Sequence, residues 1–218
     1  GVVTAFLDYS RPLKQSFGVT DVNEVVTRTV KLLQNDVPPH ISLKVELGEA
    51  LHKIDGDAEQ LKQVLINLVQ NAGQALGNKP GEILIRTVRP ERFGEFRGAE
   101  YVEIDVTDNG PGIPTDQQLH IFVPFFTTKQ KGTGLGLAIC QRIVKNHGGS
   151  IAVQSKVGEG TTFVVRLPAL PTEQPPAETP VPEGTPLPGT ISVPPPKEEP
   201  PEGGERRSRK DRKKRKVS

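Results

Sequence analysis

Residues 108–114, DNGPGIP, hold more turn-forming residues than a single hairpin turn requires. A carboxylate ends the predicted strand YVEIDVT, and two glycines and two prolines follow it. A flat ligand can approach a glycine closely because glycine has no Cβ atom, while proline stiffens the chain. A long polar connection comes next instead of a returning strand. The segment therefore indicates one side of a ligand site, to which other parts of the chain would contribute.

The composition of the chain indicates one globular domain with appended segments. Its 218 residues are 34% hydrophobic and 25% charged, which allows a packed core. The one cysteine excludes an intramolecular disulfide and suits a reducing compartment such as the cytoplasm. No apolar run approaches the ~20 residues of a membrane span, and the first residues do not resemble a signal peptide. Because the chain begins without Met and within a predicted helix, we expect it to be a piece of a longer protein.

Positive charge is concentrated at the C-terminal end. Residues 205–218 include nine Lys or Arg and two Asp or Glu, a net charge of +7, whereas the whole chain carries +2. We expect a disordered basic tail that is either solvated, in contact with an anionic surface or a nucleic acid, or similar to a nuclear signal. The Pro-rich residues 169–204 before it predict a disordered linker.

Hydrophobic periodicity predicts an α+β domain over residues 18–168. We expect residues 1–17 to be the end of a preceding helix, disturbed by Pro12. Helices on one face of a mixed or antiparallel sheet are the simplest two-layer arrangement for the remainder. The predicted helices cover residues 20–33, 57–76 and 134–149, and the predicted strands cover residues 41–47, 82–88, 101–107, 150–155 and 161–167.

The predicted helix over residues 57–76 has a polar face as well as an apolar stripe. Asp57 and Gln60 have the spacing of a capping box at its start. Asn67 and Asn71 are four residues apart and therefore share a face. That face could simply be solvated, or it could ligate Mg²⁺, which takes oxygen ligands and gains compensating charge from substrate phosphates. The second half of this helix contains no Asp or Glu, which excludes a carboxylate cage there.

Two interpretations of Asp108 remain open from the residues alone. Its carboxylate could cap the turn that follows the strand, or it could accept a hydrogen bond from the amino group of an adenine. Guanine carries an oxygen at that edge, and two acceptors would repel each other. Gly110 and Gly112 would let a flat base approach the backbone.

A second glycine group, at residues 132, 134 and 136, directly precedes the last predicted helix. Bare N–H groups at a helix N-terminus form an anion site. This spacing after a long loop is not the Rossmann fingerprint, and the Walker A pattern is absent, so a nucleotide would require a different fold. The preceding loop has three phenylalanines, which are either core residues or anchors of a lid. It also has Lys129, which is either solvated or able to reach a phosphate.

In this order, the motifs resemble the ATP-binding domain shared by gyrase, Hsp-type chaperones, sensor histidine kinases and MutL. The segment FLDYSRP resembles the end of the second dimerisation helix of histidine kinases, and NAGQAL is most similar to the nitrogen-regulation (NtrB-like) kinases. The resemblance implies a two-layer α/β sandwich of the Bergerat type with a mobile ATP lid. The matching segments are NLVQNA (67–72, N box), DNGPGIP (108–114, first glycine box), FVPFF (122–126, F box), GTGLGLAI (132–139, second glycine box) and GEGTTF (158–163, closing strand pair).

The resemblance also implies roles for individual residues toward ATP and Mg²⁺. Asn71 is expected to ligate Mg²⁺, Asp108 and Thr162 to hold the adenine, and Lys129 to meet the phosphates. The catalytic group is expected to be Asn67, Asn71 and Lys129. The remaining nucleotide-binding residues are expected to be Gly110, Gly112, Ile113, Gly132, Thr133, Gly134, Leu135, Gly136 and Leu137.

One position separates a kinase from a hydrolase within this superfamily. Gyrase-like members place a general base, Glu, four residues before the metal-binding asparagine, where this chain has Asn67. An amide cannot accept a proton at neutral pH, so an external nucleophile such as an imidazole is favoured over water. A regulatory ATP-binding module without transfer activity and a superfamily ATPase remain the alternatives.

The four histidines of the chain do not have the sequence setting of a phosphoacceptor. We therefore expect the acceptor histidine to lie on a dimerisation domain outside this chain, in a full-length homodimer. The resemblance implies onward transfer of the phosphate to an aspartate of a response regulator.

Overall fold

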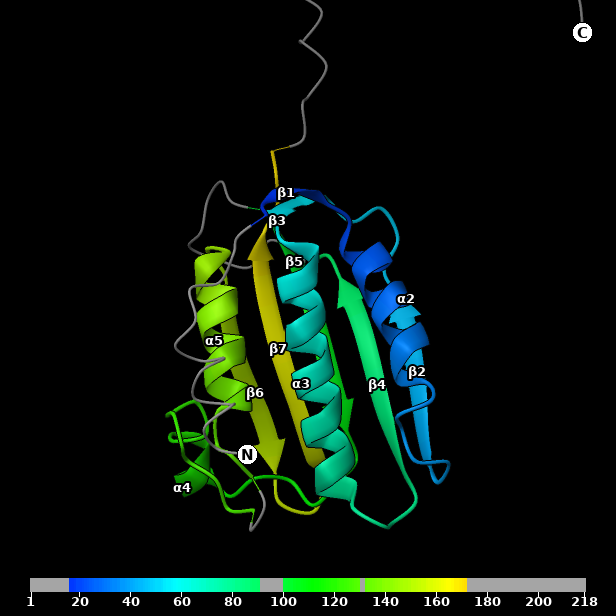
Figure 1. Ribbon diagram of the computed structural model, residues 1–218, viewed down its shortest axis with the longest axis vertical. Coiled ribbons are helices and arrows are strands. Elements are labelled where there is room, and N and C mark those ends of the chain that lie inside the picture. Colours follow the sequence, from blue (N-terminus) through cyan, green and yellow to red (C-terminus); the bar gives the residue numbers. More distant parts are fainter. Residues whose placement is uncertain (1–15, 91–99, 130–131, 172–218) are drawn as a thin grey trace, which may run out of the picture. The chain divides into compact units, whose positions relative to one another are not determined.

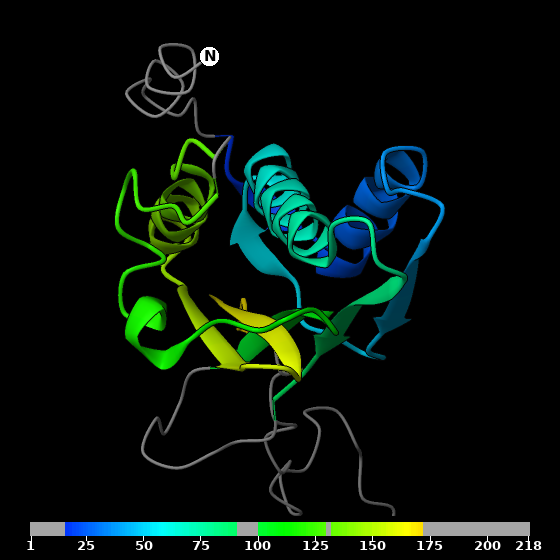
Figure 2. The ribbon, with the colours of Figure 1, turned by 90° about the horizontal axis from the view of Figure 1, so that it is seen from below.

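The protein was analysed as a computed structural model in which residues 16–90, 100–129 and 132–171 are described. The described part has two layers, a five-stranded sheet and the long helices packed on one of its faces, above the sheet in Figure 2. Residues 1–15 of the predicted helix end (1–17), residues 172–204 of the predicted linker (169–204) and the basic tail lie outside the described residues.

The larger sheet is mixed. Its strand order is β2-β4-β5-β7-β6, with β2 and β4 parallel and all other neighbours antiparallel. The two-layer α+β prediction is therefore confirmed. The strands are β2 (Ile41–Leu47), β4 (Gly81–Val88), β5 (Tyr101–Asp108), β6 (Ser150–Lys156) and β7 (Gly160–Pro168).

The helices cover one face of this sheet. α3 lies between α2 and α5 in Figure 2, and α4 lies beside the sheet edge formed by β6. The periodicity of the sequence predicted the three long helices but not the single turn of α4. The helices are α2 (Val22–Leu33), α3 (Ala58–Leu76), α4 (Thr115–Gln118) and α5 (Gly136–Asn146).

A second, two-stranded sheet pairs β1 (Gly18–Thr20) with β3 (Ile54–Gly56) in antiparallel register. It lies at the end of the sandwich where α3 begins (Figure 1). Neither strand was predicted, because three residues are too few for a period-2 pattern to be recognised. A bridge between Ile54 and Ala169 connects β3 to the chain just after β7.

The core lies between the two layers. Along β5, alternate residues are buried toward the helices, and the apolar stripe of α3 packs onto them. The single cysteine, Cys140 on α5, belongs to this core. Burial raises the pKa of its thiol to about 12, so it remains a thiol.

The start of α3 is fixed by its cap. Asp57 Oδ1 accepts hydrogen bonds from the backbone N–H groups of Glu59 (3.0 Å) and Gln60 (3.1 Å). The Gln60 side chain does not return to the Asp57 backbone as in a standard capping box. Instead, Gln60 Nε2 donates to Asp57 Oδ2 (3.2 Å), and the Asp57 N–H donates to His147 Nε2 (3.0 Å). The helix start is thus joined to the end of α5.

Candidate functional site

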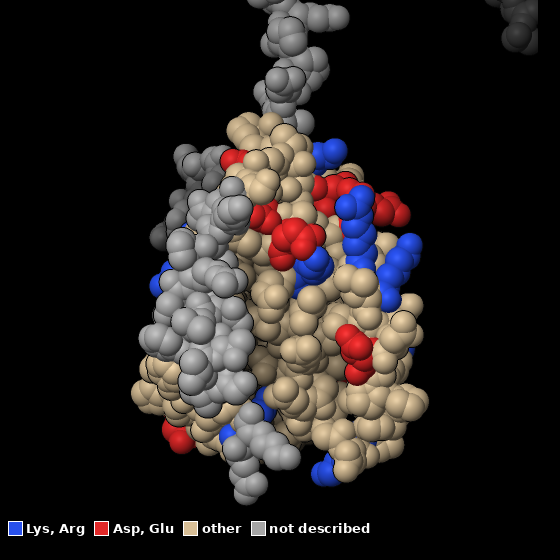
Figure 3. Space-filling view, in the orientation of Figure 1, with Lys and Arg blue, Asp and Glu red and all other residues tan. Residues whose placement is uncertain are grey.

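A cavity of about 570 Å³ lies at the opposite end of α3. Its walls come from the C-terminal half of α3, the facing ends of β5 and β7, the turn after β5, the segment after α4, and the start of α5. Figure 3 shows few charged side chains on the surface over the C-terminal half of α3, whereas both signs of charge gather over α2. The cavity is lined by neutral polar and apolar residues, with Asp108 and Lys129 as the charged residues among those described.

The cavity gathers most of the predicted site residues. Gly110, Leu135 and Thr162 do not line it. The predicted residues that do line it are Asn67, Asn71, Asp108, Gly112, Ile113, Lys129, Gly132, Thr133, Gly134, Gly136 and Leu137.

Asn67, Asn71 and Gln74 form a row on the cavity side of α3. Asn67 Nδ2 donates to the Gly136 carbonyl (3.4 Å), and Asn67 Oδ1 accepts from Gln63 Nε2 (3.1 Å). This amide therefore ties α3 to the first residue of α5. The side-chain oxygens of the other two face the Lys129 ammonium, which lies 3.4 Å from Asn71 Oδ1 and 2.7 Å from Gln74 Oε1. The row lines the cavity, although Gln74 is also exposed to solvent.

Asp108 is a buried carboxylate at the end of β5, with 4% of its surface exposed. Burial raises its pKa. The backbone hydrogen bonds from Gly110 and Thr161 and the charge of Lys129 oppose that shift only in part. The Gly110 N–H donates to Oδ1 at 2.9 Å, so Asp108 does cap its own turn. The carboxylate also lines the cavity. Both interpretations of this residue are therefore compatible with its position.

The glycines after Asp108 are required by the protein itself. Gly112 has φ +73°, and a Cβ there would lie 2.2 Å from the Lys156 carbonyl oxygen. A Cβ on Gly110 would lie 2.6 Å from Asp108 Oδ1. Both glycines were expected to allow close approach of a base. Their bare backbone also packs within the protein, Gly112 against the β6–β7 turn and Gly110 against Asp108.

The predicted lid connects α4 to α5 across the cavity. Gly134 has φ +66°, and a Cβ there would lie 2.4 Å from the backbone of Phe125. The Phe125 N–H donates to the Gly134 carbonyl (2.9 Å). Phe122 and Phe126 pack against the core, whereas Phe125 is half exposed. Two of the three phenylalanines therefore anchor the lid, and the third is attached through its backbone.

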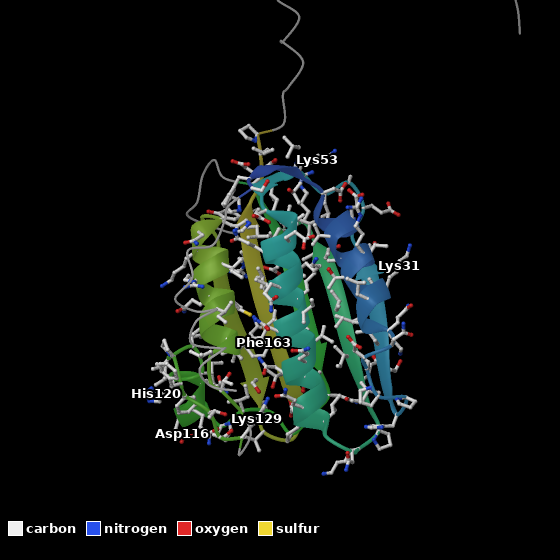
Figure 4. The ribbon with its side chains drawn as sticks, viewed as in Figure 1. Lys31, Lys53, Asp116, His120, Lys129 and Phe163 are labelled. Carbon is white, nitrogen blue, oxygen red and sulfur yellow. The ribbon has the colours of Figure 1, made fainter. Side chains whose placement is uncertain are left out.

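Lys129 brings the lid to the cavity wall. In Figure 4 its side chain lies beside the C-terminal end of α3, whereas Asp116 and His120 lie farther from that helix. Partial burial lowers the pKa of Lys129, and the Asp108 carboxylate opposes this shift. Its ammonium is the cation among the described residues that line the cavity, and Asp108 is the carboxylate.

Thr162, predicted to hold the adenine, does not line this cavity, whereas its neighbour Thr161 does. Thr161 pairs with Asp108 across β5 and β7, is buried, and lines the cavity. Thr162 points to the other face of the sheet, where its hydroxyl hydrogen-bonds Thr107 (3.0 Å). Neighbouring residues of a strand face opposite sides, so a shift of one residue moves the side chain out of the cavity.

Sequence reasoning missed two residues of the site. Gln74 was recognised as polar but was not assigned to the site, and Thr161 was passed over for its neighbour. The spacing of Gln74, three residues after Asn71 on one helix, is a signal that could have identified it.

The sequence was also compared with known families. Residues 56–171, more than half of the chain, match the family described as histidine kinase-, DNA gyrase B-, and HSP90-like ATPase. The chain belongs to this family. The predicted resemblance is thereby confirmed.

Within the family, the most similar proteins found are sensor histidine kinases. The chain is 37% identical over 174 residues to the sensor histidine kinase ZraS of Salmonella typhi, covering 79% of this chain and 36% of that protein. It is 39% identical over 150 residues to the sensory histidine kinase/phosphatase NtrB of Klebsiella oxytoca, covering 67% and 42% respectively. The chain thus spans less than half the length of these relatives.

The solved structures that resemble this chain are also histidine kinases. The catalytic domain of histidine kinase ThkA is 34% identical, with a TM-score of 0.60, and the match covers 71% of this chain and 96% of that domain. A structure of ThkA in complex with the response regulator protein TrrA matches with a TM-score of 0.62 at 30% identity, covering 79% and 48%. The fold is that of a histidine kinase catalytic domain. None of the helices in the described ranges is long and apolar enough to cross a membrane.

Proposed function

We propose that this chain is the catalytic domain of a two-component sensor histidine kinase and that it binds Mg-ATP in the cavity beside α3. Asp108 is the observation that carries the proposal. It is a buried carboxylate in the cavity wall with a raised pKa, and the donors identified for it belong to the backbone of Gly110 and Thr161. A buried charge of this kind is costly unless it receives further hydrogen bonds. The amino group of an adenine would supply one.

The residues present fit a magnesium ion held largely by phosphates. Asn71 Oδ1 already faces a cation, the Lys129 ammonium, across the cavity. The described residues contain no cluster of three His, Cys, Asp or Glu side chains that could hold a metal alone. Mg²⁺ commonly keeps one or two protein ligands and takes its other oxygens from phosphates and water. In this assignment Asn71 is the protein ligand, and the metal neutralises charge on the triphosphate.

The remaining predicted residues fall into two groups by position. Ile113 and the backbone around Gly110 and Gly112 belong to the turn after β5, so we assign them, with Thr161, to the base. Lys129 and the backbone of residues 132–137 belong to the lid and the start of α5, so we assign them to the phosphates. Bare N–H groups at the start of a helix favour negative charge.

The chemistry of the cavity favours transfer to an external nucleophile over hydrolysis. Asn67 stands where a general base would be needed, and both ends of its amide are engaged with protein groups. Asp108 is the one carboxylate among the described lining residues, and it is assigned to the base. A neutral imidazole nitrogen carries its own lone pair. Its attack forms an N–P bond and breaks the bond between the γ-phosphorus and the oxygen that bridges to the β-phosphate, and ADP leaves with that electron pair.

We infer that the acceptor histidine is not in this chain. His147 is buried between hydrogen bonds to Asp57 and Ile143, and His52 Nε2 lies 2.8 Å from Glu100 Oε2. His40 is hydrogen-bonded to the Gly77 carbonyl, and His120 packs on Phe126. None of the four lies on a long exposed helix face among the described residues.

The partners follow from the same assignment. The acceptor would lie on a dimerisation domain of a longer, homodimeric cytoplasmic protein, and the phosphate would pass to an aspartate of a response regulator. The complex of ThkA with TrrA supports a regulator as the partner type. The basic C-terminal residues remain a candidate contact for an anionic surface.

Labelled ATP tests this function directly. The chain incubated alone with γ-labelled ATP should acquire almost no acid-labile label and should release phosphate only slowly. Addition of a dimerisation domain of an NtrB-like kinase should produce acid-labile label on that domain. Strong acid-labile label on the chain alone would show that one of its own histidines is an acceptor. Rapid phosphate release without an acceptor would instead identify an ATPase.

A further inference from the structure

Within the described part of the lid, the Lys129 side chain forms hydrogen bonds to side chains of α3. Lys129 extends from the lid so that its Nζ lies 2.7 Å from Gln74 Oε1 and 3.4 Å from Asn71 Oδ1 (Figure 4). Gln74 and Asn71 are three residues apart on α3 and therefore present their oxygens side by side. Of the two contacts, the one to Gln74 has the length of a strong charge-assisted hydrogen bond, and the one to Asn71 is long.

We propose that Gln74 is a positioning residue that holds Lys129 over Asn71 when nucleotide is absent, so that a protein ammonium occupies the oxygen assigned to the magnesium ion. Binding of the metal and nucleotide then requires Lys129 to leave Gln74, and this departure releases the lid from α3. The inference rests on the proposed function, because the metal role of Asn71 is part of that proposal.

The Lys129 ammonium and the magnesium ion cannot both occupy the position beside Asn71 Oδ1, because both are positively charged. Among the described residues lining the cavity, the ammonium of Lys129 faces one carboxylate, Asp108, and several neutral amides. Asn71 contributes a neutral oxygen, which cannot offset a second positive charge placed beside Lys129. The triphosphate brings negative charge and so can receive both cations at different positions. Lys129 would move from an amide oxygen to a phosphate oxygen.

The backbone around Lys129 transmits this movement to the lid. The Lys129 N–H donates to Thr127 Oγ1 (3.1 Å), and the Gly132 N–H donates to the Lys129 carbonyl (3.1 Å). Gly132 also lies close to Thr127, because a Cβ on Gly132 would lie 2.4 Å from Thr127 Oγ1. A side chain anchored at Gln74 therefore restrains the turn from which it extends. Without Gln74, the segment around Lys129 loses its short hydrogen bond to α3.

Hydrogen exchange of the whole chain without nucleotide tests the contact itself. Gln74→Met removes the acceptor but keeps length and helix propensity, and the amides of Lys129 and Gly132 should exchange about tenfold faster, the scale of losing one hydrogen bond to a charged group. Gln74→Glu should slow the same amides, because a carboxylate holds the ammonium more strongly. Gln70→Met, one turn earlier on the same helix, is the matched control and should leave them unchanged.

The results separate this inference from the proposed function. Unchanged exchange in both Gln74 variants, or equal acceleration in Gln70→Met, would overturn the positioning role even if the wild-type chain binds ATP.

Calorimetry with a magnesium complex of a non-hydrolysable ATP analogue gives the second measurement. Gln74→Met should bind it several-fold more tightly than wild type, because no contact has to be broken first. Weaker binding with unchanged exchange would mean that Gln74 contacts the nucleotide and does not hold Lys129. Failure of every variant and of the wild type to bind would contradict the proposed function, while the exchange data would still test the contact.

Discussion

Two aspartates at opposite ends of the sandwich are equally buried but differ in their surroundings. Asp57, before α3, and Asp108, at the end of β5, each expose 4% of their surface. Asp57 accepts hydrogen bonds from the backbone of Ser16, Glu59 and Gln60 and from the Gln60 side chain. For Asp108, the donors identified are the backbone groups of Gly110 and Thr161.

The pKa values of the two carboxyls shift in opposite directions. Burial raises the pKa of both, but at Asp57 the hydrogen bonds from Ser16, Gln60 and Glu59 outweigh burial and leave the pKa below its usual value. At Asp108, burial outweighs its hydrogen bonds and the charge of Lys129, so the pKa is raised. Burial alone therefore does not distinguish a structural carboxylate from a binding one. The number of donors supplied by the protein, together with the deeper position of the Asp108 carboxyl, accounts for the opposite shifts.

The largest expected effect of this difference is on stability. Asp57→Asn should lower the free energy of unfolding by about 2–4 kcal/mol, because the new amide turns donors toward the Ser16 N–H and the Gln60 side chain. Asp108→Asn should leave stability unchanged or raise it slightly, because it removes a buried charge and can still accept from Gly110. Urea unfolding of both variants beside wild type measures the contrast. Equal losses at the two sites would contradict the distinction.

A second effect concerns pH. Because the folded-state pKa of Asp57 lies below the unfolded value of about 3.9, its contribution to stability is present above that value and is lost as pH falls through the folded-state pKa. The raised pKa of Asp108 acts with the opposite sign, so its contribution decreases as pH rises from about 3.9 through its folded-state pKa. The free energy of unfolding should therefore depend less on pH than in wild type, below pH 4 in Asp57→Asn and above pH 4 in Asp108→Asn. Urea unfolding at several pH values measures this dependence. If either variant has the same pH dependence of stability as wild type, the pKa shift assigned to that residue is wrong.

A smaller effect should separate the two threonines beside Asp108. Thr161→Val removes a hydroxyl from the cavity wall and should weaken ATP binding by about 1 kcal/mol, the scale of one hydrogen bond. Thr162→Val changes the other face of the sheet and should leave binding unchanged. Calorimetric titration of both variants checks the strand register. A loss confined to Thr162→Val would restore the residue that the sequence analysis chose.

Most of the fold could be predicted from the sequence, because long helices and strands carry repeated patterns. The apolar stripe of α3 and the capping role of Asp57 were both confirmed. The partners of Asp57 could not be predicted, since Ser16 and His147 lie 41 and 90 residues away and reach it only after folding. Local sequence patterns predict which face of a helix or strand a residue lies on, but not which residues distant in the sequence contact it.

The site was predicted less completely, for two physical reasons. Because GTTF contains two adjacent threonines, the sequence does not show which of them faces the helices. The pairing of β7 with β5 places Thr161 on that face. The contact between Lys129 and Gln74 joins residues 55 apart, so no helical or strand period indicates it. The glycines at 110 and 112 were identified, but the packing that requires them was not visible in the sequence.

The most direct test of the central claim is nucleotide selectivity at Asp108. Calorimetry in the presence of Mg²⁺ should show that the wild-type chain binds ATP more tightly than GTP, and that Asp108→Asn loses about 1–3 kcal/mol of ATP binding while remaining as stable as wild type. Equal affinities of the wild-type chain for ATP and GTP, or undiminished ATP binding by Asp108→Asn, would contradict the assignment of this carboxylate to the adenine.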